Sequence, residues 1–308
     1  MTVAPAVTSI SARMEPGDWA QLILLSVLWG GSFFFIAIAV TGLPVLTIVA
    51  VRLMIAALVL WLIVLATGRK AVRDPRAWAA MAVMGLLNNV IPFSLIVFGQ
   101  TQIPSGLASI LNATTPLWTV IVSAAFLPDE GASLRMLAGV VVGLGGVAVM
   151  IGLDSLTGLG HAILPQLAIL GATVSYAFAG TFGRRFRRMG IDPIVAATGT
   201  VTCSALMLAP VALAVDGLPA ADVAMPVWMA LLALGVISTG LAYVLYFRLL
   251  DRVGATNISL VTFLVPVSAI ILGWMILNES LGLAHLFGMA VIAAGLALID
   301  GRLLERRR

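Results

Sequence analysis

Ten long apolar runs, separated by short polar breaks, constrain this chain more than any other feature of its sequence. Each run has roughly 18–25 residues, enough for an α-helix to cross the hydrocarbon core of a bilayer. Hydrophobic residues make up 61% of the chain and charged residues only 10%, against about 25% charged in a typical soluble domain. The composition therefore excludes an ordinary soluble enzyme, a nucleic-acid binder and a disordered chain.

The runs predict an all-α integral membrane protein of ten transmembrane helices, which crosses the plasma (inner) membrane many times. The expected spans are 19–40, 44–67, 78–100, 105–127, 134–152, 162–183, 193–215, 225–249, 255–277 and 281–300. Glycine, proline and charged residues occupy the breaks between them. Residues 1–18 lack the basic start and apolar core of a cleaved signal peptide, so we expect a cytoplasmic N-terminal segment there.

Lysine and arginine residues set the expected orientation, because they favour the cytoplasmic side of a membrane. All but one of the 17 lie in the terminal segments and in alternate loops, and the loops on the other side hold none. This pattern predicts that both termini are cytoplasmic, with residues 301–308 forming a basic tail. The remaining basic residue is Arg52, inside the second span.

The two halves of the chain repeat each other at an offset of about 150 residues. The segment 85–95 aligns with 235–245, and Pro116 aligns with Pro266. Five helices is an odd number, so the second copy is expected to enter the membrane from the opposite side. Such inverted repeats suit alternating access around a site near the bilayer midplane. The expected five-helix units are 19–152 and 162–300.

A set of short motifs runs along almost the whole chain. In the first half they are Leu28-Trp29-Gly30-Gly31-Ser32, Arg52, Ala108-Ser109, Thr115-Pro116, Pro128-Asp129-Glu130 and Gly139; in the second, Tyr246, Ala255, Pro266, Asn278-Glu279-Ser280 and Gly288. In their order and doubling they resemble the drug/metabolite transporter superfamily, in its ten-helix EamA-type branch. Within that branch the chain is most similar to the YddG-type exporters of aromatic and other neutral amino acids. One departure is Ser175-Tyr176-Ala177, where many relatives have tryptophan before the alanine.

The expected spans contain almost no ionisable side chains. All 13 aspartate and glutamate residues lie in loops or near span ends. Carriers that couple to protons or sodium usually place a carboxylate where the ion binds, so a facilitative carrier is the simplest expectation, although backbone carbonyls of broken helices can also bind cations. Arg52 has two possible roles: a ligand for a substrate carboxylate, or a packing residue within the protein.

Uncharged polar and aromatic side chains inside the spans are the main candidates for substrate contact. The candidate substrate-binding residues are Trp29, Asn88, Asn89, Asn112, Tyr176, Ser238, Thr239 and Tyr243. A buried amide must face protein or water, and adjacent residues on a helix point about 100° apart. We therefore expect one of the two adjacent asparagines to line a cavity and the other to bond a neighbouring helix. The alternative for all of these residues is a purely structural role.

Prolines inside the spans suggest moving parts, because proline kinks a helix. Pro116 and Pro266 occupy matching places in the two halves, so we predict that they act as gating hinges.

Together these features predict a carrier that exports small neutral or zwitterionic metabolites, above all aromatic and other neutral amino acids, by facilitative alternating access around a central cavity. The alternatives are a multidrug exporter of hydrophobic cations, and an intramembrane enzyme or scaffold. The sequence lacks HExxH and GxSxG motifs, so we expect no enzyme activity. We expect no cofactor or metal and no nucleic-acid partner; the partners are a small-molecule substrate and membrane lipid. The oligomeric state stays open, and a monomer is compatible with the sequence.

Overall fold

The computed structural model describes residues 14–126, 133–151, 163–220 and 222–300, and every regular element in these ranges is a helix. Several predicted features lie outside the described residues. They are residues 1–13 of the N-terminal segment, the whole tail 301–308 and the motif Pro128-Asp129-Glu130.

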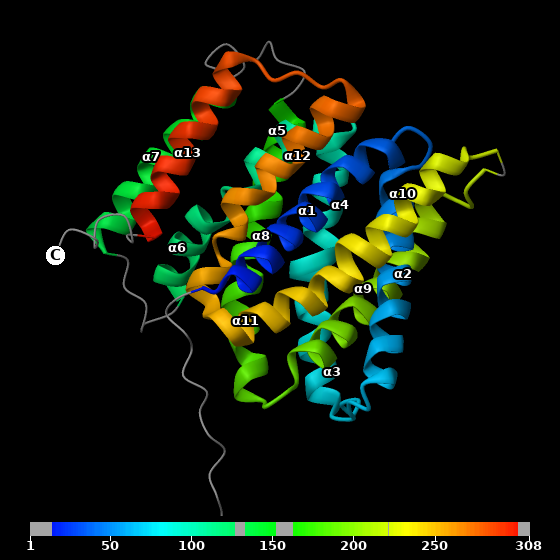
Figure 1. Cartoon of the computed structure of the whole chain (residues 1–308). Coiled ribbons are helices and arrows are strands. Elements are labelled where there is room, and N and C mark those ends of the chain that lie inside the picture. The colour runs from blue at the N-terminus through cyan, green and yellow to red at the C-terminus, as the bar shows by residue number, and fades with distance from the viewer. Residues whose placement is uncertain (1–13, 127–132, 152–162, 221, 301–308) are drawn as a thin grey trace, which may run out of the picture.

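The helices follow one another along the chain in the order shown in Figure 1. The first half contains α1 (Pro16–Ala39), α2 (Val45–Ala66), α3 (Pro75–Gly85), the π-helix η1 (Leu86–Val90), α4 (Ile91–Gln100), α5 (Ser105–Asn112), α6 (Thr115–Phe126) and α7 (Leu134–Ile151). The second half contains α8 (Ile163–Arg188), α9 (Pro193–Val215), α10 (Met225–Gly235), the π-helix η3 (Val236–Leu241), α11 (Ala242–Ile258), α12 (Val261–Leu277) and α13 (Leu283–Asp300).

Seven of the described helical stretches are long and apolar enough to cross a membrane. Three shorter apolar helices, at 134–149, 261–277 and 283–299, lie in the other predicted runs. Large apolar side chains such as Leu65, Leu206 and Leu283 are 70–85% exposed on the helix surfaces, as expected where lipid is the solvent. The all-helical prediction is confirmed for the described residues, while the count of ten spans stays a prediction.

Proline and aspartate residues explain where several helices begin. Pro16, Pro75 and Pro193 stand at the first helical position of α1, α3 and α9, where the missing N–H costs nothing. The Asp74 carboxylate caps α3 by accepting from the backbone N of Arg76, and Asp192 caps α9 in the same way. These local signals place the helix starts within a few residues of the predicted spans.

Two boundaries differ clearly from the prediction. The eighth span was expected to end at residue 249, but its helix continues to Gly254, where a non-helical backbone with φ 78° kinks α11. The sixth span was expected to end at residue 183, but α8 continues through the basic residues to Arg188. Arginine is a good helix former, and positive charge in a last turn interacts favourably with the helix dipole. The basic loop is therefore shorter than the charge pattern alone suggests.

Polar contacts between the two halves of the chain occur at both ends of the helices. One end carries the basic loops and is called the basic end here; it lies at the bottom of Figure 1. The contacts are Arg252–Asp18 and Arg69–Asp192 at the basic end, and Thr47–Asp216 and Ser105–Glu279 at the opposite end. Each contact joins a residue of the first half to a residue of the second.

Helices α7 and α13 form a pair at the side of the bundle (Figure 1). Glycines let their backbones approach closely: a Cβ on Gly146 would lie 2.7 Å from the carbonyl oxygen of Gly288 and 2.8 Å from the backbone N of Ile292. Small residues serve this purpose in membrane helix pairs. The neighbouring Gly145 has nothing within 4 Å of such a Cβ.

We expect Gly146→Ala to lower the free energy of unfolding by about 1–3 kcal/mol, because the added methyl forces the two helices apart. Gly145→Ala is the matched control, since it makes the same change one position away in open space. Thermal unfolding of the purified protein in detergent compares the two. Equal melting temperatures for both variants would show that the pair is not tightly packed here.

Candidate functional site

Two π-helical turns interrupt the third and eighth predicted spans at matching places in the two halves. They are η1 and η3, and they contain the predicted site residues Asn88 and Asn89, and Ser238 and Thr239. A π-turn widens the helix and frees backbone groups from the usual ladder, and it is often found at functional sites. The sequence predicted polar pairs at these positions but not the change of helix type.

The two π-turns have different local causes. In the first half, Pro92 lacks an N–H and cannot donate to the carbonyl of Asn88, four residues earlier. In the second half, the Thr239 hydroxyl donates to the Leu234 carbonyl at 2.8 Å and competes with the backbone for it. Within the first turn the backbone N of Ile91 donates to the Leu86 carbonyl, five residues earlier. This leaves the Leu87 carbonyl to accept from the Ser175 hydroxyl of α8 at 2.7 Å.

Arg52 lies at the centre of the predicted residues that the fold brings together. Its side chain is buried, at 5% exposure, and its Nε donates to the Thr239 hydroxyl at 2.8 Å. The guanidinium carbon lies 3.9 Å from the centroid of the Phe93 ring, a close cation–π contact. Tyr176 and Tyr243 are further electrostatic neighbours. In the described part of the chain no carboxylate forms an ion pair with Arg52.

Asn88 and Asn89 meet Tyr243 across the two halves but face different surroundings. The Asn88 amide donates to the Tyr243 hydroxyl at 3.2 Å, and that hydroxyl donates to Asn89 Oδ1 at 3.1 Å. Asn89 is fully buried, and its amide donates to the Ser204 hydroxyl of α9 at 2.9 Å. Asn88 is only half-buried. The geometry thus gives Asn89 a partner on a neighbouring helix, while substrate contact by Asn88 stays a prediction.

The aromatic candidates continue this cluster. The Trp29 ring of α1 lies 5.4 Å from the ring of Tyr246, centroid to centroid, and Tyr246 is one helical turn from Tyr243. Tyr176 and Trp29 are both partly buried against the main hydrophobic core. Aromatic faces of this kind can hold an apolar side chain or an ammonium group.

Other candidates form no side-chain hydrogen bond with the cluster within the described residues. Asn112 ends α5, and its buried Oδ1 has no hydrogen-bond partner there; the same is true of Ser238 Oγ. Pro116 lies in the first turn of α6, directly after the break at residues 113–114, and Pro266 is buried inside α12. A hinge role for the two prolines stays a prediction.

Two residues near the site were missed as specific partners from the sequence. Phe93 follows the first π-turn and stacks on Arg52, and Ser204 bonds Asn89. An aromatic side chain in a span usually anchors or packs, and a serine usually bonds its own backbone. Neither residue type therefore gives a signal without the fold.

The two asparagines should respond differently to truncation. We expect Asn89→Ala to cost about 1–3 kcal/mol of stability, because it leaves the Tyr243 hydroxyl without its buried acceptor. Asn88→Ala should leave the melting temperature near that of the wild type while it reduces transport. Thermal unfolding and liposome uptake of the two variants, measured side by side, check this. Wild-type transport by Asn88→Ala would make that residue structural.

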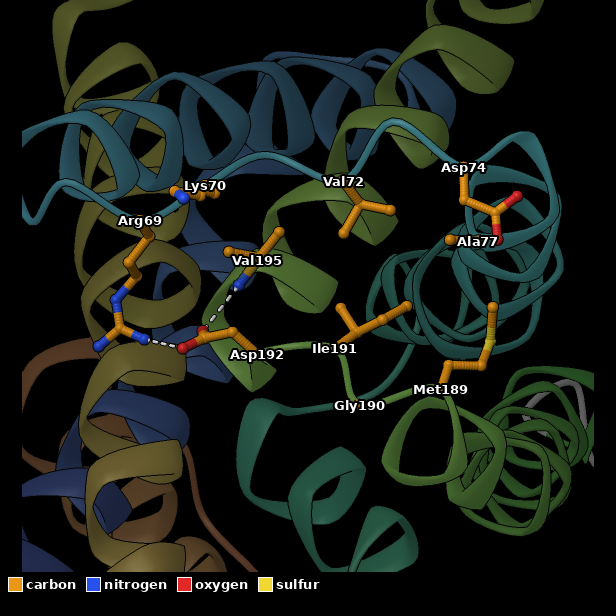
Figure 2. Close-up of a pocket in the computed structure, with 10 residues that line it drawn as sticks. All are labelled: Arg69, Lys70, Val72, Asp74, Ala77, Met189, Gly190, Ile191, Asp192 and Val195. Carbon is orange, nitrogen blue, oxygen red and sulfur yellow. Dashed lines mark hydrogen bonds and ion pairs between the residues drawn. The ribbon is translucent and has the colours of Figure 1, made fainter. Parts of the chain in front are cut away.

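A pocket of about 550 Å³ lies at the basic end, away from this cluster. Figure 2 shows it between the loop after α2 and the start of α9. Arg69 points to Asp192 and pairs with it, and the same carboxylate caps α9. Arg69 and Asp192 neutralise each other, and the other two charged lining residues, Lys70 and Asp74, are of opposite sign. None of the predicted substrate-binding residues lines it.

Comparisons with known proteins show which sequences and structures this chain is similar to. The profile of the EamA-like transporter family matches residues 19–152 and again 163–300. A protein of Bacillus subtilis (strain 168), described as the uncharacterized transporter YoaV, is 26% identical over 89% of this chain and 94% of its own length. The uncharacterized inner membrane transporter YedA of Escherichia coli (strain K12) is 26% identical over 91% of this chain and 90% of its own.

Two further proteins are similar to this chain, one in sequence and one in structure. A probable terminal-alkyne amino-acid exporter of Streptantibioticus cattleyicolor is 30% identical over 96% of this chain and 97% of its own length. A crystal structure of another protein superposes with a TM-score of 0.66 at 24% identity, covering 96% of this chain and 99% of that one. The latter supports the fold alone.

Proposed function

The chain belongs to the EamA-like transporter family, and from this premise we propose that it exports small zwitterionic metabolites, with neutral amino acids, aromatic ones included, as the leading substrates. It is an integral, multi-pass membrane protein, in line with its family and its apolar helices. The members of this family are transporters rather than enzymes.

The observation that carries the substrate class is the buried guanidinium of Arg52. A cation inside a membrane span is costly unless it is paired, and the described residues around Arg52 supply a hydroxyl and an aromatic face but no carboxylate. A substrate carboxylate supplies the missing charge and bonds to the planar donor array of arginine. A hydrophobic cation is disfavoured at the same place, because it meets a like charge.

The rest of the cluster suits the other parts of an amino acid. The Asn88 amide and the Tyr243 hydroxyl offer polar contacts beside Arg52. The Trp29 and Tyr246 rings form an aromatic wall for an apolar side chain. Few directional contacts imply broad specificity and weak binding, with a Kd on the order of 1 mM. The amino-acid exporter among the relatives supports the same class.

We propose that transport proceeds by alternating access between two inverted five-helix units, in ten spans with both termini cytoplasmic. Matching helices of the two halves exchange partners: α3 packs on α9 as α10 packs on α2, and α1 packs on α12 as α8 packs on α6. This exchange is what a pseudo-two-fold axis in the membrane plane produces. The polar contacts between halves at both ends of the helices then act as gates, one at the basic, cytoplasmic end and one opposite.

The test is uptake of labelled phenylalanine and leucine into liposomes that hold the purified protein, with and without an imposed pH gradient. Saturable uptake that ignores the gradient supports a facilitative amino-acid carrier. Accumulation driven by the gradient reveals ion coupling. Transport of ethidium but of neither amino acid overturns the proposed substrate class and favours hydrophobic cations. Empty liposomes are the control for leakage.

A further inference from the structure

A second groove lies at the basic end, between α3 of the first half and α8 of the second. It encloses about 330 Å³. It is lined by Arg76, Ala79, Ala80, Val83, Phe182, Arg185 and Met189. None of these residues belongs to the substrate cluster around Arg52, so the groove needs its own explanation.

The mouth of the groove is cationic. Arg76 and Arg185 are its only charged lining residues, both are exposed, and neither forms an ion pair within the described ranges. The Arg185 guanidinium carbon lies 4.8 Å from the centroid of the Phe182 ring, which holds it beside the groove. The nearest acid along the chain, Asp74, lines the neighbouring pocket and is engaged as the cap of α3.

The remainder of the groove is apolar and leads away from the basic end. Val83 follows Arg76 by seven residues, roughly 10 Å along the helix axis, and it is 44% exposed. Ala79 is exposed between them on α3. A cationic mouth above an apolar wall on a membrane helix is complementary to an amphiphile with an anionic head and a hydrocarbon tail.

We propose that this groove binds an anionic phospholipid, whose phosphate contacts Arg76 and Arg185 and whose acyl chain lies along Ala79 and Val83. The proposal rests on the membrane orientation proposed above and not on the identity of the transported substrate. Because α3 and α8 belong to different halves, a bound lipid bridges the two units at their cytoplasmic end. Lipid occupancy therefore favours the arrangement in which these helices are close.

The experiment measures lipid retention by native mass spectrometry of the full-length protein, purified in a neutral detergent. Phosphatidylglycerol and phosphatidylcholine with identical acyl chains are titrated separately, and inorganic phosphate is added as a competitor in a third arm. Arg76→Gln with Arg185→Gln removes both cations of the mouth. Arg187→Gln with Arg188→Gln is the matched control. It also removes two exposed charges, both on α8, but neither residue lines either of the two described pockets.

We expect the wild type to prefer phosphatidylglycerol over phosphatidylcholine. Removing the two mouth arginines should weaken phosphatidylglycerol binding by about fivefold for each charge, or about 25-fold together, while the control pair stays within about twofold. Equal losses in the two double variants, or equal binding of both lipids, overturn the proposal in favour of general surface attraction. If millimolar phosphate displaces the lipid completely, the groove is a site for a free anion and the proposed lipid site is overturned. The experiment measures lipid retention and not amino-acid uptake. A failure of the proposed transport function therefore does not affect the test of lipid binding.

Discussion

Replacing Arg52 with glutamine is expected to reduce uptake of neutral amino acids by about 10–100-fold, the loss that follows when a hydrogen bond to a charged group is removed. Glutamine retains a donor but carries no charge, so a substrate carboxylate loses its counter-charge inside the span. Arg52→Lys should lose less, because it keeps the charge but not the planar contact with Phe93 or the rigid fork of donors. Arg248→Gln, at an exposed position on α11, is the control.

A structural role for Arg52 also lowers uptake, so the experiment needs a readout that separates the two roles. Amino-acid amides lack the carboxylate but keep the side chain and the ammonium. If Arg52 binds the carboxylate, wild-type protein should prefer the acid over the amide, and Arg52→Gln should lose that preference. Wild-type protein that carries both equally well would contradict the assignment, whatever the variant does. Melting temperatures identify variants that fail because they unfold.

Replacing Glu279 with glutamine is expected to destabilise the protein by about 2–3 kcal/mol, because buried donors lose a charged acceptor. The Glu279 carboxylate accepts from the backbone N of Ser105 at 2.9 Å, from its hydroxyl at 2.7 Å and from the backbone N of Gly106 at 3.2 Å. It thereby caps the first turn of α5 from the other half of the chain. Thermal unfolding in detergent measures the loss.

The turn that presents Glu279 depends on its neighbour. Asn278 adopts a left-handed conformation, with φ 55° and ψ 29°, at the end of α12. Asparagine tolerates this region better than most residues, and it directs the next residue towards α5.

Two further variants make the Glu279 prediction specific. Asp251→Asn removes a carboxylate at an exposed position of α11 and should change the melting temperature little. Ser105→Ala removes one of the three hydrogen bonds, so its effect should not add to that of Glu279→Gln. Additive losses, or a control that destabilises as much, would rule out the cap as the cause.

Much of the helical layout could be predicted because a membrane leaves few choices. The backbone must satisfy its own hydrogen bonds in lipid, so apolar length alone placed most of the described helices within or close to a predicted span. Proline and aspartate at their starts added local precision, as at Pro75 and Asp192. The sequence predicts too early an end for α8, because a run of arginines is typical of a loop beside a membrane, whereas arginine also continues a helix readily.

The candidate site could be predicted only as a set of residue types. A polar pair inside an apolar span is visible in the sequence, so Asn88, Asn89, Ser238 and Thr239 were found. The sequence also predicted that one of the two asparagines bonds a neighbouring helix, but it did not predict which one, because that depends on which helix lies beside each side chain. The contact of Phe93 with Arg52 could not be predicted, because it arises between different helices.

The sequence by itself determined the membrane class, the positions of the helices, the charge asymmetry and the doubling of motifs, because these depend on composition and local chain order. The tertiary structure decided which distant residues meet. Ser105 and Glu279 are 174 positions apart and Arg52 and Thr239 are 187 apart, and no periodicity links them. The π-turns have local causes, but the fold decided which partner the Leu87 carbonyl finds there, the Ser175 hydroxyl of α8.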